Sequence, residues 1–162
     1  MSRQYGVTYT PSAVGEVNVV EQMKATQAII GGEGNGGVIY PELHYGRDAL
    51  VGTALFLSYM ARSGKNCIEI RSLYPEYTIS KNKIELKDDI DIPKLLDSIA
   101  EKYASYDVNR ADGVKIDFED CWVHVRSSNT EPILRIYAEA LTENIADNIA
   151  KKIMLDIREM IQ

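Results

Sequence analysis

The sequence has few of the residues that build disulfide frameworks or metal sites. Its 162 residues include two cysteines, Cys67 and Cys121, and two histidines. The cysteines do not form a C-x-x-C pair, so neither a disulfide scaffold nor a zinc site is expected. A chain with isolated cysteines fits a reducing compartment, and we therefore predict a cytoplasmic location.

Long apolar runs and clusters of basic residues are also missing. No run approaches the roughly 18 apolar residues that a membrane span needs. The first residues, M-S-R-Q-Y-G-V-T-Y, lack the apolar core of a signal peptide. The formal net charge is −6, and Lys and Arg are dispersed. We therefore expect no membrane and no nucleic acid as partner, although an anion can bind where positive charge is focused locally.

Hydrophobic residues make up 45% of the chain, and its length allows one or two domains. In the first half, strand-like and helical patterns alternate, which is typical of an α/β fold. The predicted strands are Tyr5–Tyr9, Ala28–Ile30 and Val38–Tyr40, and the predicted helices are Val14–Ala25, Ala49–Arg62 and Asn66–Leu73. The helix from residue 49 is so apolar that we expect it to be almost wholly buried, with Asp48 as its N-cap and Gly64 as its stop.

The pattern changes within Tyr77–Lys83, where polar residues separate two short apolar segments. We place a domain junction and a hinge there. After it, Asp91 and Thr142 are the expected N-caps of two helices, the second over Glu143–Gln162. The strands predicted between these helices are Val114–Phe118, Cys121–Val125 and Ile133–Ala138. This order predicts an α+β domain with an antiparallel sheet and helices on one face.

A polar loop, R-S-S-N-T-E-P at residues 126–132, joins the last two predicted strands. Side chains alternate between the two faces of a strand. Val125 and Leu134 are therefore expected on the core side, and Arg126 and Arg135 share the opposite side. Two guanidinium groups beside a loop with hydroxyl and amide donors suit a phosphate group. The same residues also allow a polar hairpin tip with two solvated arginines.

A glycine-rich loop, G-G-E-G-N-G-G at residues 31–37, contains the G-x-G-x-x-G spacing of dinucleotide-binding loops. That use requires a helix to begin directly after the loop, but V-I-Y-P follows, which opposes a helix. Glycines in this loop let the backbone approach a ligand, and Glu33 and Asn35 are suited to bind a pair of sugar hydroxyls. A flexible turn with an incidental acidic residue is the alternative.

Both loops resemble motifs of the α-D-phosphohexomutase family, which includes phosphoglucomutases, phosphomannomutases and phosphoglucosamine mutases. R-S-S-N-T-E-P is similar to the family's phosphate-binding pattern R-x-S-(G or N)-T-x-P, and G-E-G-N-G-G is similar to its sugar-binding loop G-E-x-S-G-H. The motifs occur in the family's order. The resemblance therefore implies that residues 1–79 are the C-terminal part of the family's third domain, the end of a three-layer α/β domain, and that residues 80–162 are its fourth domain.

The resemblance also implies roles for individual residues. The phosphate of the substrate that does not react is bound by Arg126, Ser128, Asn129, Thr130 and Arg135. The sugar hydroxyls are bound by Glu33 and Asn35. Arg47 is a further candidate at the border of the ligand, although it could equally form a salt bridge at the start of the next helix. The chain departs from the family pattern at Ser127, where many members have Pro, and at Gly37, where the pattern has His.

Family members transfer a phosphoryl group between the 1- and 6-positions of a hexose or hexosamine phosphate through a bisphosphate intermediate. Their phosphoserine lies in a T-A-S-H-N-like loop and their Mg²⁺ in a D-x-D-x-D-R-like loop, and neither motif occurs here. The resemblance therefore implies the substrate-recognition half of a phosphohexomutase, inactive alone and without a catalytic residue or metal ligand of its own. Mg²⁺ and a hexose bisphosphate activator would act in a longer parent with further N-terminal domains.

Two other functions remain open from the residues. The chain could be a standalone sugar-phosphate-binding or regulatory module, or a nucleotide-binding protein that uses the glycine-rich loop. The motifs are shared by members of the family that act on glucose, mannose, glucosamine and N-acetylglucosamine phosphates, so they do not specify the sugar.

Overall fold

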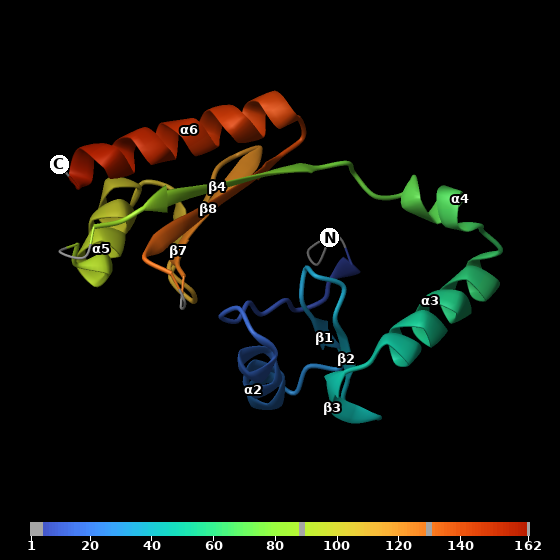
Figure 1. The fold of residues 1–162 in the computed structure, drawn as a ribbon. Coiled ribbons are helices and arrows are strands. Elements are labelled where there is room, and N and C mark those ends of the chain that lie inside the picture. Colours follow the sequence, from blue (N-terminus) through green and yellow to red (C-terminus); the bar gives the residue numbers. More distant parts are fainter. Residues whose placement is uncertain (1–4, 88–89, 129–130, 162) are drawn as a thin grey trace. The chain divides into compact units, whose positions relative to one another are not determined.

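The structure, a computed structural model, describes residues 5–87, 90–128 and 131–161. The chain divides into two compact units, Met1–Tyr74 and Pro75–Gln162, and each unit has its own sheet (Figure 1). Each unit also has its own cluster of buried residues. The predicted fold class, an α/β segment followed by an α+β domain, is confirmed. Within the described ranges, no helix is both long and apolar enough to cross a membrane.

The first unit contains a small antiparallel sheet in the order β1-β2-β3. Its strands are β1 (Gly31–Gly32), β2 (Val38–Tyr40) and β3 (His44–Arg47), and its helices are α2 (Glu16–Thr26), α3 (Ala49–Ser63) and α4 (Cys67–Arg71). Val19 and Met23 of α2 pack with Ile39 of β2 to form the buried cluster of this unit. This cluster places the N-terminal turn of α2 in the same unit as the glycine-rich turn that joins β1 to β2.

The helix α3 has the ends that the sequence predicts. Asp48 is its N-cap and accepts a hydrogen bond from the backbone nitrogen of Val51 at 2.9 Å, and Gly64 ends it in the left-handed region with φ 65. The expectation that this helix is buried is wrong, because no residue of α3 is buried. Leu50 is 83% exposed and Leu57 is 55% exposed. An apolar sequence predicts the helix, but burial needs a partner surface, and the described part of this unit places none against these side chains.

Two of the predicted strands in the first unit are also wrong. No strand lies within Tyr5–Tyr9, and the apolar run Ala28–Ile30 precedes the strand rather than forming it. Ile29 is 82% exposed, whereas the backbone of Gly31–Gly32 pairs with β2. The prediction failed because a short apolar run does not reveal which backbone groups find a partner. The strand at Val38–Tyr40 is confirmed.

The second unit is built on a five-stranded antiparallel sheet in the order β4-β8-β7-β6-β5. Its strands are β4 (Thr78–Glu85), β5 (Asp107–Asn109), β6 (Val114–Asp117), β7 (Cys121–Ser127) and β8 (Ile133–Ala140), and its helices are α5 (Ile92–Lys102) and α6 (Glu143–Met160). The sequence predicted both helices and β6, β7 and β8, but it did not predict the short edge strand β5. The predicted N-caps Asp91 and Thr142 are confirmed.

The core of the second unit lies between one face of the sheet and the two helices. Figure 1 shows α6 running along the sheet beside β4 and β8. Alternate residues of the strands face the helices; the fully buried ones are Val114, Ile116, Val123, Val125, Leu134, Ile136 and Ala138. Ile153 and Ile157 of α6 and Ile99 of α5 complete this core. The intervening strand residues, which include both arginines of the predicted phosphate site, therefore lie on the opposite face of the sheet.

The strand β4 runs without interruption from Thr78 to Glu85 and pairs along its whole length with β8. The polar residues 80–83 therefore lie inside one continuous strand together with the apolar residues on either side of them. β4 is an edge strand, so polar side chains are tolerated along much of it. The two units meet in sequence at Tyr74 and Pro75, and most of the expected junction at Tyr77–Lys83 lies inside this paired strand. The boundary between residues 79 and 80 stays a prediction.

Candidate functional site

The first candidate site lies at the loop end of the hairpin formed by β7 and β8. Arg126 of β7 and Arg135 of β8 are direct partners in the antiparallel register. Residues that face each other across antiparallel strands point to the same face of the sheet. The loop between the strands is closed by a hydrogen bond from the backbone nitrogen of Ser128 to the carbonyl oxygen of Ile133, at 3.0 Å. The alternation of strand residues thus brings the two guanidinium groups side by side.

Each of these arginines has a distant carboxylate neighbour. Arg126 Nη1 lies 3.7 Å from Asp112 Oδ2, and Arg135 Nη2 lies 3.6 Å from Glu131 Oε2. These distances exceed the roughly 2.7–3.2 Å of a direct hydrogen bond, and such partly exposed pairs stabilise a protein only weakly. The side chains of Arg126 and Arg135 are 23% and 35% exposed. An incoming anion can therefore reach both arginines and replace their carboxylate neighbours at little cost.

The predicted hydroxyl and amide donors of the loop are only partly described. Ser128 lies close to the arginine pair, since Arg135 Nη2 donates to its hydroxyl oxygen at 3.5 Å. Asn129 and Thr130, which the sequence also assigns to the phosphate, lie outside the described residues. The structure thus brings together Arg126, Arg135 and Ser128 from the predicted set.

The glycine turn that precedes β6 packs closely against the backbone of β7 at Arg126. Gly113 has φ 64, and a Cβ atom at this position would lie 2.3 Å from the carbonyl oxygen of Val125 and 3.0 Å from Cα of Arg126. The neighbouring residue Asp112 supplies the carboxylate near Arg126, and its carbonyl oxygen lies 2.6 Å from Nε2 of His124. Asp-Gly is a local turn signal, and such a signal gives no indication that the turn lies against an arginine of the site.

A third cation extends the arginine pair across the sheet. Lys83 of β4 is the register partner of Arg135, so Lys83, Arg135 and Arg126 form one row on the face opposite to the core. Lys83 Nζ lies 3.6 Å from Glu85 Oε1, and its side chain is 61% exposed. Sequence analysis missed Lys83 as a site residue, because only the pairing of β4 with β8, which lie far apart in the chain, reveals that it belongs to the row.

The second candidate site is the glycine-rich turn between β1 and β2 in the first unit. The backbone nitrogen of Gly36 donates to the carbonyl oxygen of Glu33, and the nitrogen of Glu33 donates to the carbonyl oxygen of Gly37, each at 3.1 Å. The side-chain oxygen Oδ1 of Asn35 accepts a hydrogen bond from the nitrogen of Gly37 at 3.0 Å. The turn is thus held by three hydrogen bonds of its own, in contrast to a flexible glycine loop. Because the side-chain oxygen Oδ1 of Asn35 already accepts this hydrogen bond, the side-chain nitrogen Nδ2 is the group suited to contact a ligand.

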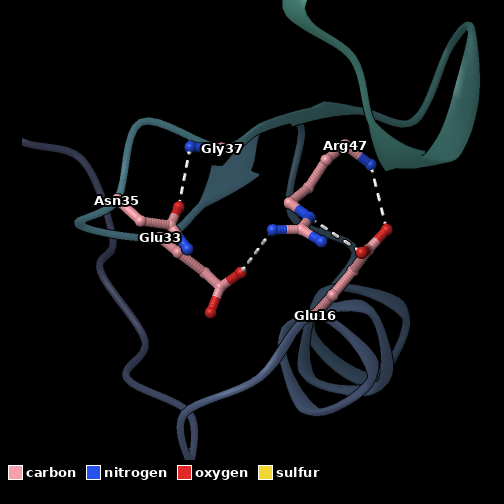
Figure 2. Close-up of polar contacts among 5 residues, drawn as sticks. All are labelled: Glu16, Glu33, Asn35, Gly37 and Arg47. Carbon is pink, nitrogen blue, oxygen red and sulfur yellow. Dashed lines mark hydrogen bonds and ion pairs between the residues drawn. The ribbon is translucent and has the colours of Figure 1, made fainter.

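The carboxylate of Glu33 lies against Arg47 of β3 (Figure 2). Arg47 Nη1 is 3.8 Å from Glu33 Oε2, and the side chain of Glu33 is 15% exposed. Arg47 is held more closely by Glu16, whose Oε2 accepts from Nε at 2.8 Å and whose Oε1 accepts from the backbone nitrogen of Arg47 at 3.0 Å. The backbone hydrogen bond from Arg47, followed by the one from its side chain, lowers the pKa of Glu16. Glu16 was not predicted as part of this site.

The two roles considered for Arg47 are separated by this geometry. The residue that pairs with Asp48 at the start of α3 is His44, with Nε2 3.1 Å from Oδ2, whereas Arg47 pairs with Glu16 and Glu33. The hydrogen bond from the Val51 nitrogen, followed by the one from His44, lowers the pKa of Asp48. Arg47 therefore belongs to the glycine-rich turn rather than to the helix cap.

Within residues 5–87, 90–128 and 131–161, no group of three or more His, Cys, Asp or Glu side chains lies close enough together to hold a metal. The two sites differ in the polar groups that they present. One site presents guanidinium and hydroxyl groups to an anion, and the other presents a carboxylate and an amide to hydroxyl groups.

The chain thus consists of an α/β segment that carries the glycine-rich turn and an α+β domain that carries the paired arginines. Residues 1–77 match the family model described as phosphoglucomutase/phosphomannomutase, alpha/beta/alpha domain III. Residues 82–155 match the model described as phosphoglucomutase/phosphomannomutase, C-terminal domain. The chain belongs to the phosphoglucomutase/phosphomannomutase family, and the family resemblance of the two motifs is confirmed.

Curated relatives and a solved structure agree with this assignment. The chain is 35% identical over 152 residues to a phosphoglucosamine/phosphogalactosamine mutase of Sulfurisphaera tokodaii, covering 93% of the chain and 33% of the relative. It is 37% identical over 147 residues to a phosphoglucomutase/phosphomannomutase of Thermococcus kodakarensis, covering 90% and 32%. A family protein of Burkholderia thailandensis superimposes with a TM-score of 0.77 at 23% identity, covering 99% and 35%. The chain thus spans about a third of the length of the curated relatives that it matches.

Proposed function

We propose that this chain is the substrate-recognition half of a phosphohexomutase, in which it holds the phosphate that does not react and reads the hydroxyl groups of the sugar. The observation that carries the proposal is the direct pairing of Arg126 with Arg135 at the end of the β7–β8 hairpin. Two guanidinium groups on one face match the oxygens of a phosphate and remain charged at every physiological pH. The substrate is a hexose or hexosamine phosphate.

The proposed reaction is the transfer of a phosphoryl group between the 1- and 6-positions of the sugar through a bisphosphate intermediate. Such an intermediate must turn over between two half-reactions, so the phosphate at rest needs an anchor that accepts either end of the molecule. In this proposal, Arg126, Arg135 and Ser128 are that anchor, together with Asn129 and Thr130, while Glu33 and Asn35 contact hydroxyl groups. Binding energy from these remote groups positions the reacting phosphate.

The catalytic serine, the Mg²⁺ ion and the site of activation by a hexose bisphosphate belong, in this proposal, to other domains of a longer parent. The assignment rests on the family resemblance, which places the serine and metal loops in the first and second domains. Apart from those domains, the proposed partner is the hexose phosphate itself. The proposed location is the cytoplasm.

The exposure of α3 favours a parent with further domains over a standalone binding module. Leu50, Phe56 and Leu57 of this helix are 83%, 43% and 55% exposed. Burying an apolar side chain of this size contributes about 1.5–3 kcal/mol, and soluble proteins rarely leave a contiguous apolar surface uncovered. We infer that another segment of the parent covers this helix.

The proposal is tested first by turnover. The chain alone, supplied with Mg²⁺ and a hexose bisphosphate, should not interconvert the 1- and 6-phosphates of glucose, mannose, glucosamine or N-acetylglucosamine, whereas the parent should convert at least one pair. Robust turnover by the chain alone would contradict the assignment of catalysis to other domains.

A second test addresses the anchor directly. Arg126→Ala in the parent should lower kcat/KM by about ten- to a hundredfold, because a charged hydrogen bond to the phosphate is lost. Arg158→Ala is the matched control, since Arg158 is an exposed residue of α6, the helix that packs on the sheet face opposite to Arg126. Equal kcat/KM values for wild type and Arg126→Ala would remove the anchor role.

A further inference from the structure

The side chain of Arg47 links Glu16 of α2 to Glu33 of the glycine-rich turn, a link that the sequence did not predict. Figure 2 shows its guanidinium group between Glu16 of α2 and Glu33 of the glycine-rich turn. The contacts to Glu16 are short, at 2.8 Å from Nε and 3.0 Å from the backbone nitrogen, whereas the contact from Nη1 to Glu33 measures 3.8 Å. Glu16 therefore fixes the guanidinium group, and one terminal nitrogen is left to face Glu33.

The exposed fractions of the side chains of Glu33, Glu16 and Arg47 agree with these contacts. Glu33 is 15% exposed, Glu16 is 34% exposed and Arg47 is 49% exposed. A carboxylate with little exposed surface loses much of its hydration, and a cation or hydrogen-bond donor that faces it offsets this loss. Arg47 is the cation that the structure places against Glu33.

The glycine at position 37 makes room for this arrangement. A Cβ atom at Gly37 would lie 2.7 Å from Cδ and 3.2 Å from Cγ of Arg47. The aliphatic stem of Arg47 therefore occupies the space that a side chain at residue 37 would need. The glycine that stands here in place of the family's His thus leaves room for the arginine ten residues further along the chain.

We propose that Arg47 is a positioning residue for substrate recognition, which holds the carboxylate of Glu33 toward the sugar and is itself held by Glu16. This inference rests on the proposed function. The ligand chemistry is a pair of neighbouring hydroxyl groups on a sugar phosphate. One hydroxyl donates to the carboxylate of Glu33, and the other accepts from the amide nitrogen of Asn35, whose oxygen is already bound to Gly37.

The arrangement predicts a specific pattern of kinetic effects. In the full-length parent, Glu33→Gln should weaken discrimination between the preferred hexose phosphate and its 3-deoxy and 4-deoxy analogues. Arg47→Ala should lower kcat/KM by about tenfold and reduce the same discrimination, because the carboxylate loses its fixed direction. Arg47→Lys should recover part of the loss, and Glu16→Gln should act in the same direction with a smaller effect.

A double-mutant cycle separates positioning from direct contact. If Arg47 acts through Glu33, Arg47→Ala should add little to the effect of Glu33→Gln on kcat/KM. Additive effects would mean that Arg47 contacts the substrate by itself, which would overturn the positioning role. Arg62→Ala, at an exposed position near the end of α3 in the same unit, is the control and should leave kcat/KM and discrimination unchanged.

A double-mutant cycle between Gly37 and Arg47 tests their steric contact without depending on charge. Gly37→Ala in the wild type should lower kcat/KM with the natural sugar and reduce discrimination, because the added methyl group displaces the stem of Arg47. In the Arg47→Ala background, Gly37→Ala should have a clearly smaller effect, since the close Cδ and Cγ atoms are gone and only Oδ1 of Asn35, at 3.2 Å, remains near the added Cβ. An equal effect of Gly37→Ala in both backgrounds would overturn the coupling.

Failure of the proposed function would be distinguishable from failure of this inference. A parent that converts none of the four hexose phosphates would contradict the proposed function. The contact between Arg47 and Glu33 is then measured in the same parent by a double-mutant cycle of thermal unfolding. A coupling of zero in that cycle would overturn the positioning contact, and a measurable coupling would support it.

Discussion

The two units of the chain differ in how much of their apolar surface is buried. In the second unit, the sheet and two helices enclose a continuous core in which Ile136 and Ile153 are fully buried. In the first unit, the buried cluster consists of Val19, Met23 and Ile39, and the apolar helix α3 buries none of its residues. The difference teaches that the second unit has the features of a domain that folds by itself, whereas the first unit carries the glycine-rich turn on a framework with little core.

The largest expected effect contrasts a core residue of the second unit with an exposed residue of α3. Ile136→Ala removes a side chain that is 0% exposed and should lower the free energy of unfolding by about 2–5 kcal/mol. Leu50→Ala, at a position 83% exposed, should change it by less than about 0.5 kcal/mol. Urea unfolding followed by circular dichroism, which reports on the helices and strands of both units, checks the contrast. Similar losses for the two variants would contradict the contrast.

The next effect compares two glycines with nearly the same backbone conformation. Gly113 in the second unit has φ 64 and Gly64 in the first has φ 65, but an added Cβ meets close backbone atoms only at Gly113, whereas Gly64 has none within 4 Å. Gly64→Ala should therefore cost about 1 kcal/mol for the left-handed backbone alone. Gly113→Ala should cost about 2–4 kcal/mol, because strain and a steric clash add. Thermal unfolding followed by circular dichroism checks the order of the two losses, and a smaller loss at Gly113 would contradict it.

A pH-dependent effect concerns the second unit alone. The hydroxyl of Tyr103, next to α5, donates to Asp156 of α6, and Lys102 Nζ lies 2.8 Å from the same carboxylate. Burial, followed by the hydrogen bond to Asp156, raises the pKa of Tyr103 above 10.0. Burial opposes the charge of Asp156, but hydrogen bonds from Lys102 and Tyr103 outweigh it and lower its pKa below 3.8.

The signs of these two shifts define a window of stability. The raised pKa of Tyr103 contributes stability below pH 10.0 that is lost as the pH rises further. The lowered pKa of Asp156 contributes stability above pH 3.8 that is lost as the pH falls. Tyr103→Phe should therefore cost about 1–2 kcal/mol near neutral pH and progressively less outside this window. Urea midpoints across the pH range check this, with Tyr77→Phe, 51% exposed, as the control; a constant difference would contradict it.

The smallest expected effect concerns a helix cap in the well-packed unit. Asp91 accepts a hydrogen bond from the backbone nitrogen of Lys94 at 3.1 Å, and this bond, followed by the side-chain bond from Lys94, lowers the pKa of Asp91. Asp91→Ala should lower the stability of the second unit by about 1 kcal/mol. Asp91→Asn keeps a cap acceptor and should lose clearly less. Equal losses for the two variants in urea unfolding would contradict a capping role.

Some of this architecture follows from local sequence patterns. The alternation of apolar and polar residues in Cys121–Val125 and Ile133–Ala138 predicts the hairpin, and it places Arg126 and Arg135 on one face. That prediction works because alternation and a short connection together leave little freedom in the pairing of neighbouring strands. The N-caps of α3, α5 and α6 were predictable for a similar reason, since a cap depends on residues within one turn of helix.

Other features depend on contacts between distant segments. Lys83 joins the cation row only through the pairing of β4 with β8, and Glu16 reaches Arg47 from a different element. Neither residue type nor spacing reveals such partners. The burial of α3 was predicted wrongly for the same reason. An apolar composition favours burial, but it does not show whether another segment packs against the helix. Sequence reasoning thus identified the two loops but not the residues that hold them.

The ladder between β4 and β8 has a mechanical consequence. β4 begins shortly after Pro75, where the second unit starts, and it is bonded along its full length to the strand that carries Arg135. Tension applied through the preceding segment would load this ladder before any other part of the sheet. The strand nearest in sequence to the first unit is therefore also a stiff link to the end of the hairpin that carries the proposed phosphate anchor.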